Sequence, residues 1–245
     1  MSPTIREGPP GERAIVEAGR LPARYGYQMQ SVFLAHVRPF LAPGISILDV
    51  GAGRAPTLAT EDRPSGCFYA GLDASRAELE AAVPGAYDAT FVHDITHPLE
   101  LGRAFDVVLS WQVLEHVRSL DATIENLRRV LRTGGTLIAH FSGTFAVFSL
   151  AARLMPHRLR VLAMTRLLGH REEEKFPAYY DRCYHGALLE ILDPWSSVTV
   201  VPFYRGATYF EFCRPLQRAY VAYESLAERR GPLNLATHYL LVARR

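Results

Sequence analysis

The sequence predicts an α/β protein built on a mostly parallel sheet with helices on both faces. Three observations lead to this prediction: short β-branched runs alternate with helical segments, the first run ends in a glycine-rich turn, and an acidic residue closes the second run. Strand–helix alternation is typical of parallel sheets, because consecutive parallel strands need a crossover connection, usually a helix. For 245 residues that are 49% hydrophobic, we expect one domain with an elaboration rather than two full domains.

The expected elements follow one another along the first 143 residues. Apolar residues at helical spacing predict a helix over residues 27–41, which Pro43 and Gly44 end. A shorter helix is expected over residues 75–82, and another leads through Leu131 to a glycine pair. Runs of buried type predict five strands, over residues 45–50, 67–72, 90–93, 105–110 and 136–141.

The pattern changes after Gly143. A helix-like stretch over residues 145–193 is rich in Arg, Leu, His and Tyr, and it is followed by an expected strand, helix and strand at 198–203, 212–229 and 237–243. We therefore predict a single domain with four parts, namely an N-terminal arm (1–27), a ligand-binding core (28–143), a helical substrate lid (144–195) and C-terminal strands and helix (196–245).

The sharpest motif is the turn from Leu48 to Pro56, directly after the first strand. Gly51 and Gly53 allow a tight turn and a close approach of a ligand, and open α/β sheets bind ligands at the carboxyl ends of their strands. Asp73 ends the second strand, 73 − 51 = 22 residues after Gly51. A carboxylate at this place can accept hydrogen bonds from ribose hydroxyls, so the motif predicts a ligand that contains adenosine.

Dinucleotides and S-adenosylmethionine (SAM) both bind to such a turn. The dinucleotide motif needs a third Gly or Ala three residues after Gly53, where a helix N-terminus meets the pyrophosphate. Pro56 stands there instead, and it lacks an amide proton and adds bulk. Asp49 would repel a pyrophosphate but suits a ligand that carries an ammonium and a sulfonium. We therefore favour SAM over NAD(P).

The segment 48–55 resembles motif I of class I SAM-dependent methyltransferases, the group also called methyltransferase type 11. Segments 71–75, 93–95, 105–117 and 129–137 resemble later motifs of the group in the right order, so the resemblance covers residues 28–143. It implies a Rossmann-like, seven-stranded, mostly parallel sheet whose last strand is antiparallel, with a helical insertion after strand five. It also implies cofactor contacts from ten residues: Asp49, Gly51, Gly53, Asp73, Ala74, Asp94, Ile95, Ser110, Trp111 and Gln112.

Some acidic and aromatic residues of these segments also have a purely structural interpretation. Asp94 could be an ordinary turn acid, and Trp111 could be a core aromatic. Asp106, at a strand start in the segment 105–117, is more often a capping or loop-pairing residue than a ligand contact.

Methyl transfer from a sulfonium can rely on proximity and orientation, and a base is needed only if the acceptor must lose a proton. The candidates for catalytic residues are His116, which follows strand four, and Tyr180 and His185 in the expected lid. Some quinone O-methyltransferases have Glu-x-x-Glu-His in the segment of His116 and use a divalent cation. Because Gln112 replaces the first glutamate here, we predict no metal.

Composition limits the partners. The formal net charge is +2, from 27 basic and 25 acidic residues, without a run of like charges, so we expect no nucleic acid. The N-terminus lacks an apolar signal segment, and three scattered cysteines suit a reducing cytoplasm. Arginines among leucines over residues 150–168 could form a membrane surface, but such stripes more often pack on their own core, so membrane contact is not expected.

These observations predict a cytoplasmic enzyme that methylates an oxygen, nitrogen or carbon of a small molecule. A sugar, a natural product of secondary metabolism or a quinone-like ring would all fit as acceptor. Two alternatives stay open, an NAD(P)-dependent oxidoreductase on a Rossmann fold and a non-catalytic SAM-binding partner subunit. The use of a base, and the choice between monomer and homodimer, are not determined at this point.

Overall fold

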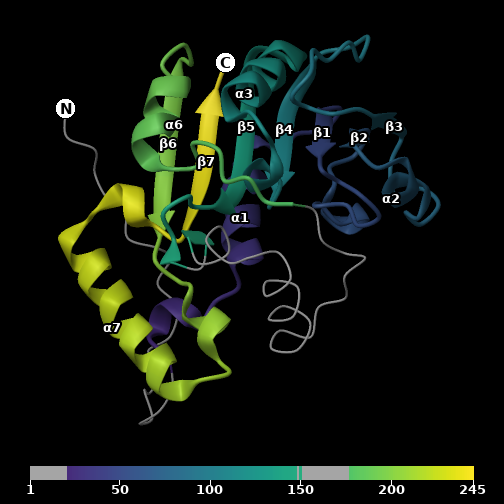
Figure 1. Ribbon diagram of the computed structural model, residues 1–245. Coiled ribbons are helices and arrows are strands. Elements are labelled where there is room, and N and C mark those ends of the chain that lie inside the picture. The colour runs from purple at the N-terminus through teal and green to yellow at the C-terminus, as the bar shows by residue number, and fades with distance from the viewer. Residues whose placement is uncertain (1–20, 148, 151–176) are drawn as a thin grey trace.

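A seven-stranded sheet forms the centre of the protein (Figure 1). The computed structural model describes residues 21–147, 149–150 and 177–245. The strand order is β3-β2-β1-β4-β5-β7-β6, and β7 runs antiparallel to both of its neighbours. The predicted class I methyltransferase fold is therefore confirmed. The strands are β1 (Ser46–Val50), β2 (Phe68–Asp73), β3 (Ala89–Val92), β4 (Phe105–Trp111), β5 (Leu131–Ser142), β6 (Ser197–Phe203) and β7 (His238–Arg244).

Serine caps and a proline account for some of the bounds of the described helices. The described α-helices are α1 (Met29–Val37), α2 (Arg76–Glu80), α3 (Leu120–Val130), α6 (His185–Ile191) and α7 (Arg214–Arg230). The hydroxyls of Ser75 and Ser119 cap α2 and α3 by accepting hydrogen bonds from backbone N–H groups of the first turn. The helix predicted over residues 27–41 is shorter than expected. It continues only as the 3-10 turn η2 (Arg38–Phe40), because Pro39 cannot donate a helical hydrogen bond.

The sheet separates two hydrophobic clusters, because successive strand residues point to opposite faces. On one face Leu48 and Val50 of β1 pack in the same cluster as residues of α3 and α6. On the other face Ile47 packs with Phe33 and Val37 of α1. We call these the α3 face and the α1 face.

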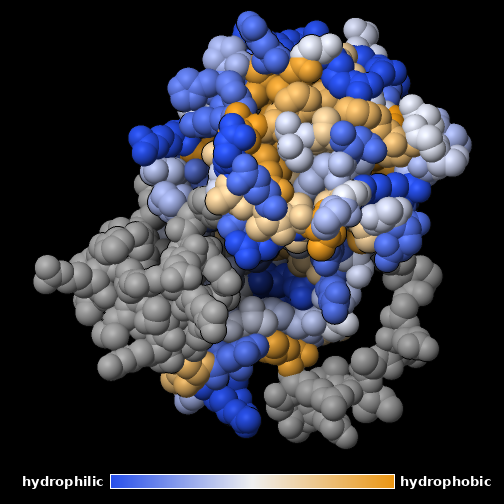
Figure 2. Space-filling view, turned by 90° about the vertical axis from the view of Figure 1, so that its right-hand side faces the viewer, coloured by the Kyte–Doolittle hydropathy of each residue, from blue (hydrophilic) through white to orange (hydrophobic). Residues whose placement is uncertain are grey.

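The carboxyl ends of β1, β2, β4 and β5 meet at one edge of the sheet, the lower edge in Figure 1, towards α7. The antiparallel β7 starts at the same edge. Figure 2 shows the molecule from the β3 side, with apolar residues on the body of the sheet and a hollowed, hydrophilic zone just below it. This carboxyl edge is therefore where the predicted site residues collect.

Parts of the predicted organisation lie outside the described residues. These are residues 1–20 of the arm, residues 151–176 of the lid and almost all of the basic stretch 150–168. The division into four parts stays a prediction. None of the helices in the described part is long and apolar enough to cross a membrane.

Candidate cofactor and acceptor site

The glycine turn after β1 is locked against the segment after β4. Gly51 and Gly53 have φ values of +69° and +51°, in the left-handed region that glycine tolerates best. A Cβ atom added to Gly51 would lie 2.2 Å from Cγ2 of Val113. Glycine is therefore required at position 51 for two reasons. The first is its backbone conformation, and the second is the close approach of the Val113 side chain, which is 62 residues further on (113 − 51).

Asp73 lies beside this turn, as predicted. Its Oδ2 accepts a hydrogen bond of 3.1 Å from Gly53 N, and its Oδ1 accepts one of 2.8 Å from Ser75 N. The neighbouring Ala74 is exposed. The turn, the carboxylate and a small exposed residue thus lie together at the carboxyl edge, in an arrangement that suits an adenosine ribose.

Asp49 has a different placement from the direct cofactor contact that the resemblance implied. Its side chain is fully buried, and it accepts hydrogen bonds of 2.7 Å from Thr57 N, Thr57 Oγ1 and Tyr69 Oη. Burial raises the pKa of Asp49 to about 6, although these hydrogen bonds act in the opposite direction. Because its carboxylate points into the protein, we interpret Asp49 as the residue that holds the turn 51–57 in position.

Asp94 and Ile95 follow β3. Ile95 belongs to the core of the α3 face with 6% of its surface exposed, and its carbonyl accepts a hydrogen bond from Asn126 Nδ2. Asp94 is exposed, and its Oδ1 accepts hydrogen bonds from Thr96 N and Thr96 Oγ1. The turn-acid interpretation accounts for these contacts, and an adenine contact by Asp94 stays a prediction.

The end of β4 shows three neighbouring residues in different environments. Ser110 is buried on the α3 face, Trp111 is half-buried on the α1 face, and Gln112 is exposed. Gln112 has a φ of +57°, which is strained for a residue with a side chain, and its N–H donates to the carbonyl of His140. Such strain is often retained at functional sites.

Trp111 packs against the core of the α1 face, and a cofactor contact from it stays a prediction. Its ring stacks on His140 with a centroid distance of 4.5 Å and meets Phe33 of α1 edge-on at 5.1 Å. The imidazole of His140 stacks in turn on His238, with centroids 5.3 Å apart. An aromatic and imidazole row therefore extends along the carboxyl edge from β4 to β7.

Glu115 joins two segments that are distant in the sequence. It lies in the 3-10 turn η4 (Leu114–His116), and its backbone carbonyl accepts hydrogen bonds of 2.9 Å from both Tyr179 N and Tyr180 N. Its buried side chain accepts a hydrogen bond from Ser142 N through Oε1, and burial raises its pKa. Thr144 Oγ1 donates to the carbonyl of Tyr180. Residues 177–181 are thereby held against the ends of β4 and β5.

His116 is the histidine nearest to this junction in the chain. Its Nδ1 lies 3.2 Å from the carbonyl oxygen of Pro177. Because a carbonyl only accepts hydrogen bonds, Nδ1 must carry the proton, and in the neutral ring Nε2 is then an acceptor.

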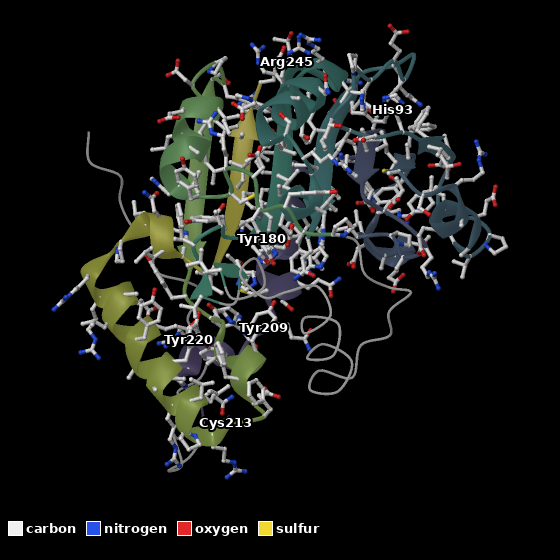
Figure 3. The ribbon with its side chains drawn as sticks, viewed as in Figure 1. His93, Tyr180, Tyr209, Cys213, Tyr220 and Arg245 are labelled. Atoms are coloured by element: carbon white, nitrogen blue, oxygen red, sulfur yellow. The ribbon has the colours of Figure 1, made fainter. Side chains whose placement is uncertain are left out.

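Tyr180 and Tyr209 both lie on the side of the carboxyl edge of the sheet (Figure 3). Tyr209 lies in the 3-10 turn η6 (Ala207–Phe210). Burial, together with electrostatic repulsion from Tyr180 and Glu115, raises its pKa to about 12. Tyr209 is not among the residues predicted from the sequence, because nothing in the local pattern distinguishes it among 12 tyrosines.

His185 lies apart from these residues, and its role as a catalytic residue stays a prediction. It begins α6, which packs mainly against β6 and the turn η7 (Leu233–Leu235), and its backbone lies at the hydroxyl of Tyr239 on the α3 face. No contact in the described part of the chain joins its side chain to His116, Glu115 or Tyr180.

The opposite edge of the sheet carries an open hollow of about 450 Å³, lined in part by Asp106 and Arg132. Asp106 accepts a hydrogen bond from Ser46 N and pairs with Arg132 at 2.7 Å. These contacts give Asp106 the role of a strand-start pairing residue. Among the residues with described positions, no group of three or more His, Cys, Asp and Glu side chains is arranged to hold a metal ion.

A family model with the description "Methyltransferase domain" matches residues 25–180. The chain belongs to this family. It is a SAM-dependent methyltransferase, and SAM is its cofactor. The NAD(P)-dependent oxidoreductase and the non-catalytic subunit are thereby set aside.

Two ubiquinone biosynthesis O-methyltransferases illustrate its relatives. The one from Mesorhizobium japonicum is 29% identical over 184 residues, which cover 71% of this methyltransferase and 68% of the relative. The one from Bartonella bacilliformis is 31% identical over 143 residues, which cover 53% and 56%. The matches thus span between about half and two thirds of the relatives' length.

Solved structures support the fold. Phosphoethanolamine N-methyltransferase 2 from Haemonchus contortus, in complex with SAM, has a TM-score of 0.55 and 16% identity, covering 88% of this chain and 52% of that one. A SAM-dependent methyltransferase from Archaeoglobus fulgidus has a TM-score of 0.52 and 13% identity, covering 91% and 94%. At such low identity these structures share the architecture and carry no information on the acceptor.

Proposed function

We propose that this methyltransferase transfers the methyl group of SAM to a hydroxyl oxygen of a small acceptor, with His116 as the general base. The observation that carries the proposal is the contact between His116 Nδ1 and the Pro177 carbonyl. It fixes the tautomer in which Nδ1 carries the proton and Nε2 of the neutral ring is the acceptor. The similarity to O-methyltransferases of ubiquinone biosynthesis supports oxygen as the methylated atom.

The cofactor is proposed to bind at the glycine turn. Gly51 and Gly53 leave the backbone uncovered there, and Asp73 offers its carboxylate to the ribose. Ala74 and the segment from Ser110 to Gln112 complete the proposed contacts. When bound, SAM supplies a methyl group that is already activated on a sulfonium.

The protein's own residues would handle the proton and the alignment. His116 Nε2 would take the hydroxyl proton as the acceptor oxygen forms its bond to the methyl carbon, while the electrons of the breaking C–S bond return to sulfur. Tyr209 stays protonated at neutral pH, because its pKa is about 12, so we assign it no part in the proton transfer. Glu115 would position the junction through its bonds to Ser142, Tyr179 and Tyr180 rather than react.

The test compares His116→Asn with the unchanged enzyme. The asparagine amide is able to donate to the Pro177 carbonyl but is no base, so we expect kcat/KM for hydroxylated acceptors to fall by about 10²–10⁴-fold. S-adenosylhomocysteine (SAH) formation with a panel of phenols and sugars measures activity, and calorimetric titration with SAH checks that cofactor affinity stays within about two-fold.

Asp73→Ala is the complementary control. It should weaken SAH binding by about ten-fold or more, which is about 1.4 kcal/mol, without selecting between acceptors. Full activity of His116→Asn would remove His116 from the mechanism, and methylation of amines but not of hydroxyls would overturn the proposed acceptor class.

A further inference from the structure

The carbonyl groups of the glycine turn are bound by a residue from outside the turn. The hydroxyl of Tyr87 donates to the carbonyl oxygens of Ala52 and Gly53, at 3.1 Å and 3.2 Å. A phenol has one proton, so the two carbonyls share it in a three-centre hydrogen bond. Burial raises the pKa of Tyr87 above its ordinary value, and the hydroxyl therefore keeps this proton at neutral pH. Tyr87 lies just before β3 and is 34 residues away from Gly53 in the chain.

Three features of β2 and β3 fix the position of the Tyr87 ring. Asp88 N donates to the Tyr69 carbonyl at 2.8 Å, and Tyr69 N donates to Asp88 Oδ2 at 2.7 Å. The rings of Tyr87 and Tyr69 are stacked, with centroids 5.9 Å apart and an angle of 10° between their planes. A Cβ atom added to Gly71 would lie 2.8 Å from two ring carbons of Tyr87, so glycine at this position leaves room for the ring. The hydroxyl thus has a rigid support that directs it to the turn.

The amide groups of the same turn are bound by β2. The carbonyl of Leu72 accepts hydrogen bonds from the N–H groups of residues 51 and 52, at 2.7 Å and 3.2 Å, and Asp73 Oδ2 accepts one from Gly53 N at 3.1 Å. The peptide groups of Gly53 therefore have Asp73 on their amide side and Tyr87 on their carbonyl side. Because glycine has more conformational freedom than any other residue, hydrogen bonds on both sides are needed to keep the turn in one conformation.

The two stacked tyrosines act on different parts of the turn. The hydroxyl of Tyr69 donates to buried Asp49 at 2.7 Å and accepts a hydrogen bond of 3.0 Å from Leu58 N. Tyr69 therefore holds the residues at the two ends of the turn, whereas Tyr87 holds the middle, next to the carboxylate of Asp73. Loss of the Tyr87 hydroxyl would release the part of the turn that faces the proposed ribose site.

We propose that Tyr87 is a positioning residue of the cofactor site, whose hydroxyl orders the glycine turn and its contact with Asp73 before SAM binds. The inference rests on the proposed function, because it places SAM at this turn. A loop that already has its binding conformation raises affinity, since binding then does not have to supply the free energy of ordering it. Tyr87 acts through the backbone of the turn and takes no part in the methyl transfer.

The test is a calorimetric titration of full-length Tyr87→Phe and of the unchanged protein with SAH. Phenylalanine keeps the stacked ring and loses only the hydroxyl. We therefore expect the Kd of SAH to rise by about three- to ten-fold, the effect of one net hydrogen bond. Tyr204→Phe is the matched control, because the Tyr204 hydroxyl also donates to a backbone carbonyl, that of Pro232, at 3.2 Å. It removes a similar hydrogen bond at a distant site, so SAH affinity should stay within about two-fold.

Amide hydrogen exchange of residues 51–54 distinguishes ordering of the turn from a general loss of stability. Without SAH, exchange in this segment should be at least about three-fold faster in Tyr87→Phe than in the unchanged protein. Saturating SAH should remove the difference, because the bound ligand then holds the turn. Tyr204→Phe should leave exchange in this segment unchanged.

An unchanged SAH affinity in Tyr87→Phe, or weaker binding without faster exchange of residues 51–54, would overturn the role of Tyr87. Asp73→Ala separates this failure from a failure of the proposed function. If Asp73→Ala weakens SAH binding and Tyr87→Phe does not, SAM binds at the turn and only the role of Tyr87 is wrong. If neither variant weakens binding, SAM does not bind at this turn, and both proposals are wrong.

Discussion

The two sides of the site are built in different ways. The cofactor side comes from one stretch of chain, because Gly51, Gly53 and Asp73 lie within 22 residues of one another. The proposed acceptor side joins distant segments, since His116 and its partner Pro177 are 61 residues apart. A local sequence motif can therefore indicate a cofactor, whereas the residues proposed to bind the acceptor come together only in the folded chain.

The largest expected effect tests whether the glycine turn of the cofactor side depends on a residue that is distant in the sequence. Gly51→Ala places a Cβ in the left-handed region and 2.2 Å from Val113 Cγ2. Backbone strain of about 1–2 kcal/mol and overpacking of about 1–3 kcal/mol should lower the free energy of unfolding by about 2–5 kcal/mol and weaken SAH binding. Denaturant unfolding and SAH calorimetry measure both.

The double variant Gly51→Ala, Val113→Ala separates the two causes. Removing the Val113 methyl groups relieves the overlap but not the strain, so stability should return only in part. If the single variant were as stable as the unchanged protein, the proposed contact between the two turns would be wrong.

The pH dependence of stability distinguishes the buried groups of the two sides. In the unfolded chain histidine gains its proton near pH 6.5, but in the folded protein the pKa values of His140 and His238 are about 3 and about 4, mainly because of burial. Between these values the unfolded chain binds more protons, so stability should fall as the pH drops below about 6.5, by up to about 1.4 kcal/mol per pH unit for each ring.

Asp49 has the opposite effect on how stability changes with pH. Its folded pKa of about 6 lies above that of an unfolded aspartate, so the folded protein binds the additional proton and gains stability as the pH falls from about 6 to about 4. His140→Phe should therefore flatten the acid branch of the stability curve, and Asp49→Asn should steepen it. Thermal unfolding between pH 7.5 and 4.5 checks this, and identical curves for the two variants would contradict the assignment.

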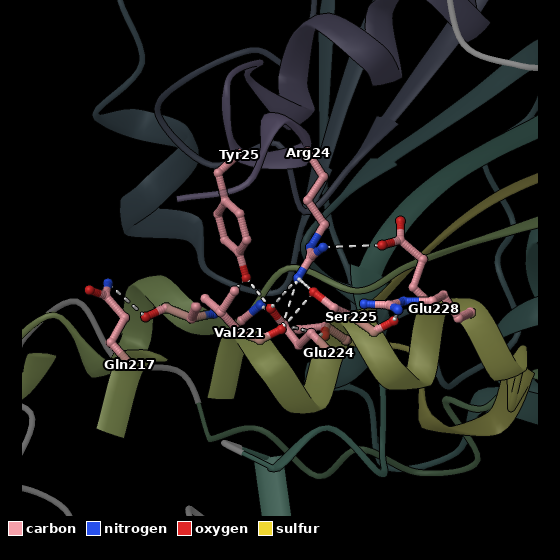
Figure 4. A network of polar contacts seen from close by, with 11 residues as sticks. Arg24, Tyr25, Gln217, Val221, Glu224, Ser225 and Glu228 are labelled. Carbon is pink, nitrogen blue, oxygen red and sulfur yellow. Dashed lines mark hydrogen bonds and ion pairs between the residues drawn. The ribbon is translucent and has the colours of Figure 1, made fainter. Parts of the chain in front are cut away.

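The smallest expected effect concerns the contacts of Arg24 and Tyr25 with α7, which we call the clasp (Figure 4). Tyr25→Phe removes the hydroxyl that donates to buried Glu224 and accepts from Ala207 N, and it should cost about 1–3 kcal/mol of stability. Because no described contact links the clasp to the glycine turn, SAH affinity should stay within about two-fold.

Tyr223→Phe is the matched control for the clasp. Tyr223 lies on α7, and in the described portion its hydroxyl has no hydrogen bond, so the change in stability should stay within about 0.5 kcal/mol. A Tyr25→Phe variant that loses SAH affinity would show that the two sides are coupled.

The sequence by itself determined the order of strands and helices, the glycine turn and Asp73. These features follow from local chemistry: β-branched runs favour strands, glycine permits positive φ, and the acid closes its own strand. Local patterns carry no information on distance, so the inward orientation of Asp49 and the position of His185 on the α3 face could not be predicted from the sequence.

Only the tertiary structure decided which distant groups meet. The order of the sheet places β4 beside β1 and so brings Val113 to Gly51, and it inserts β7 beside β5 and so brings His238 to His140. The tautomer of His116 depends on its contact with Pro177, which is 61 residues away in the chain. Such properties belong to pairs of residues far apart in the chain, and the physical reason is that only packing sets the distance within each pair.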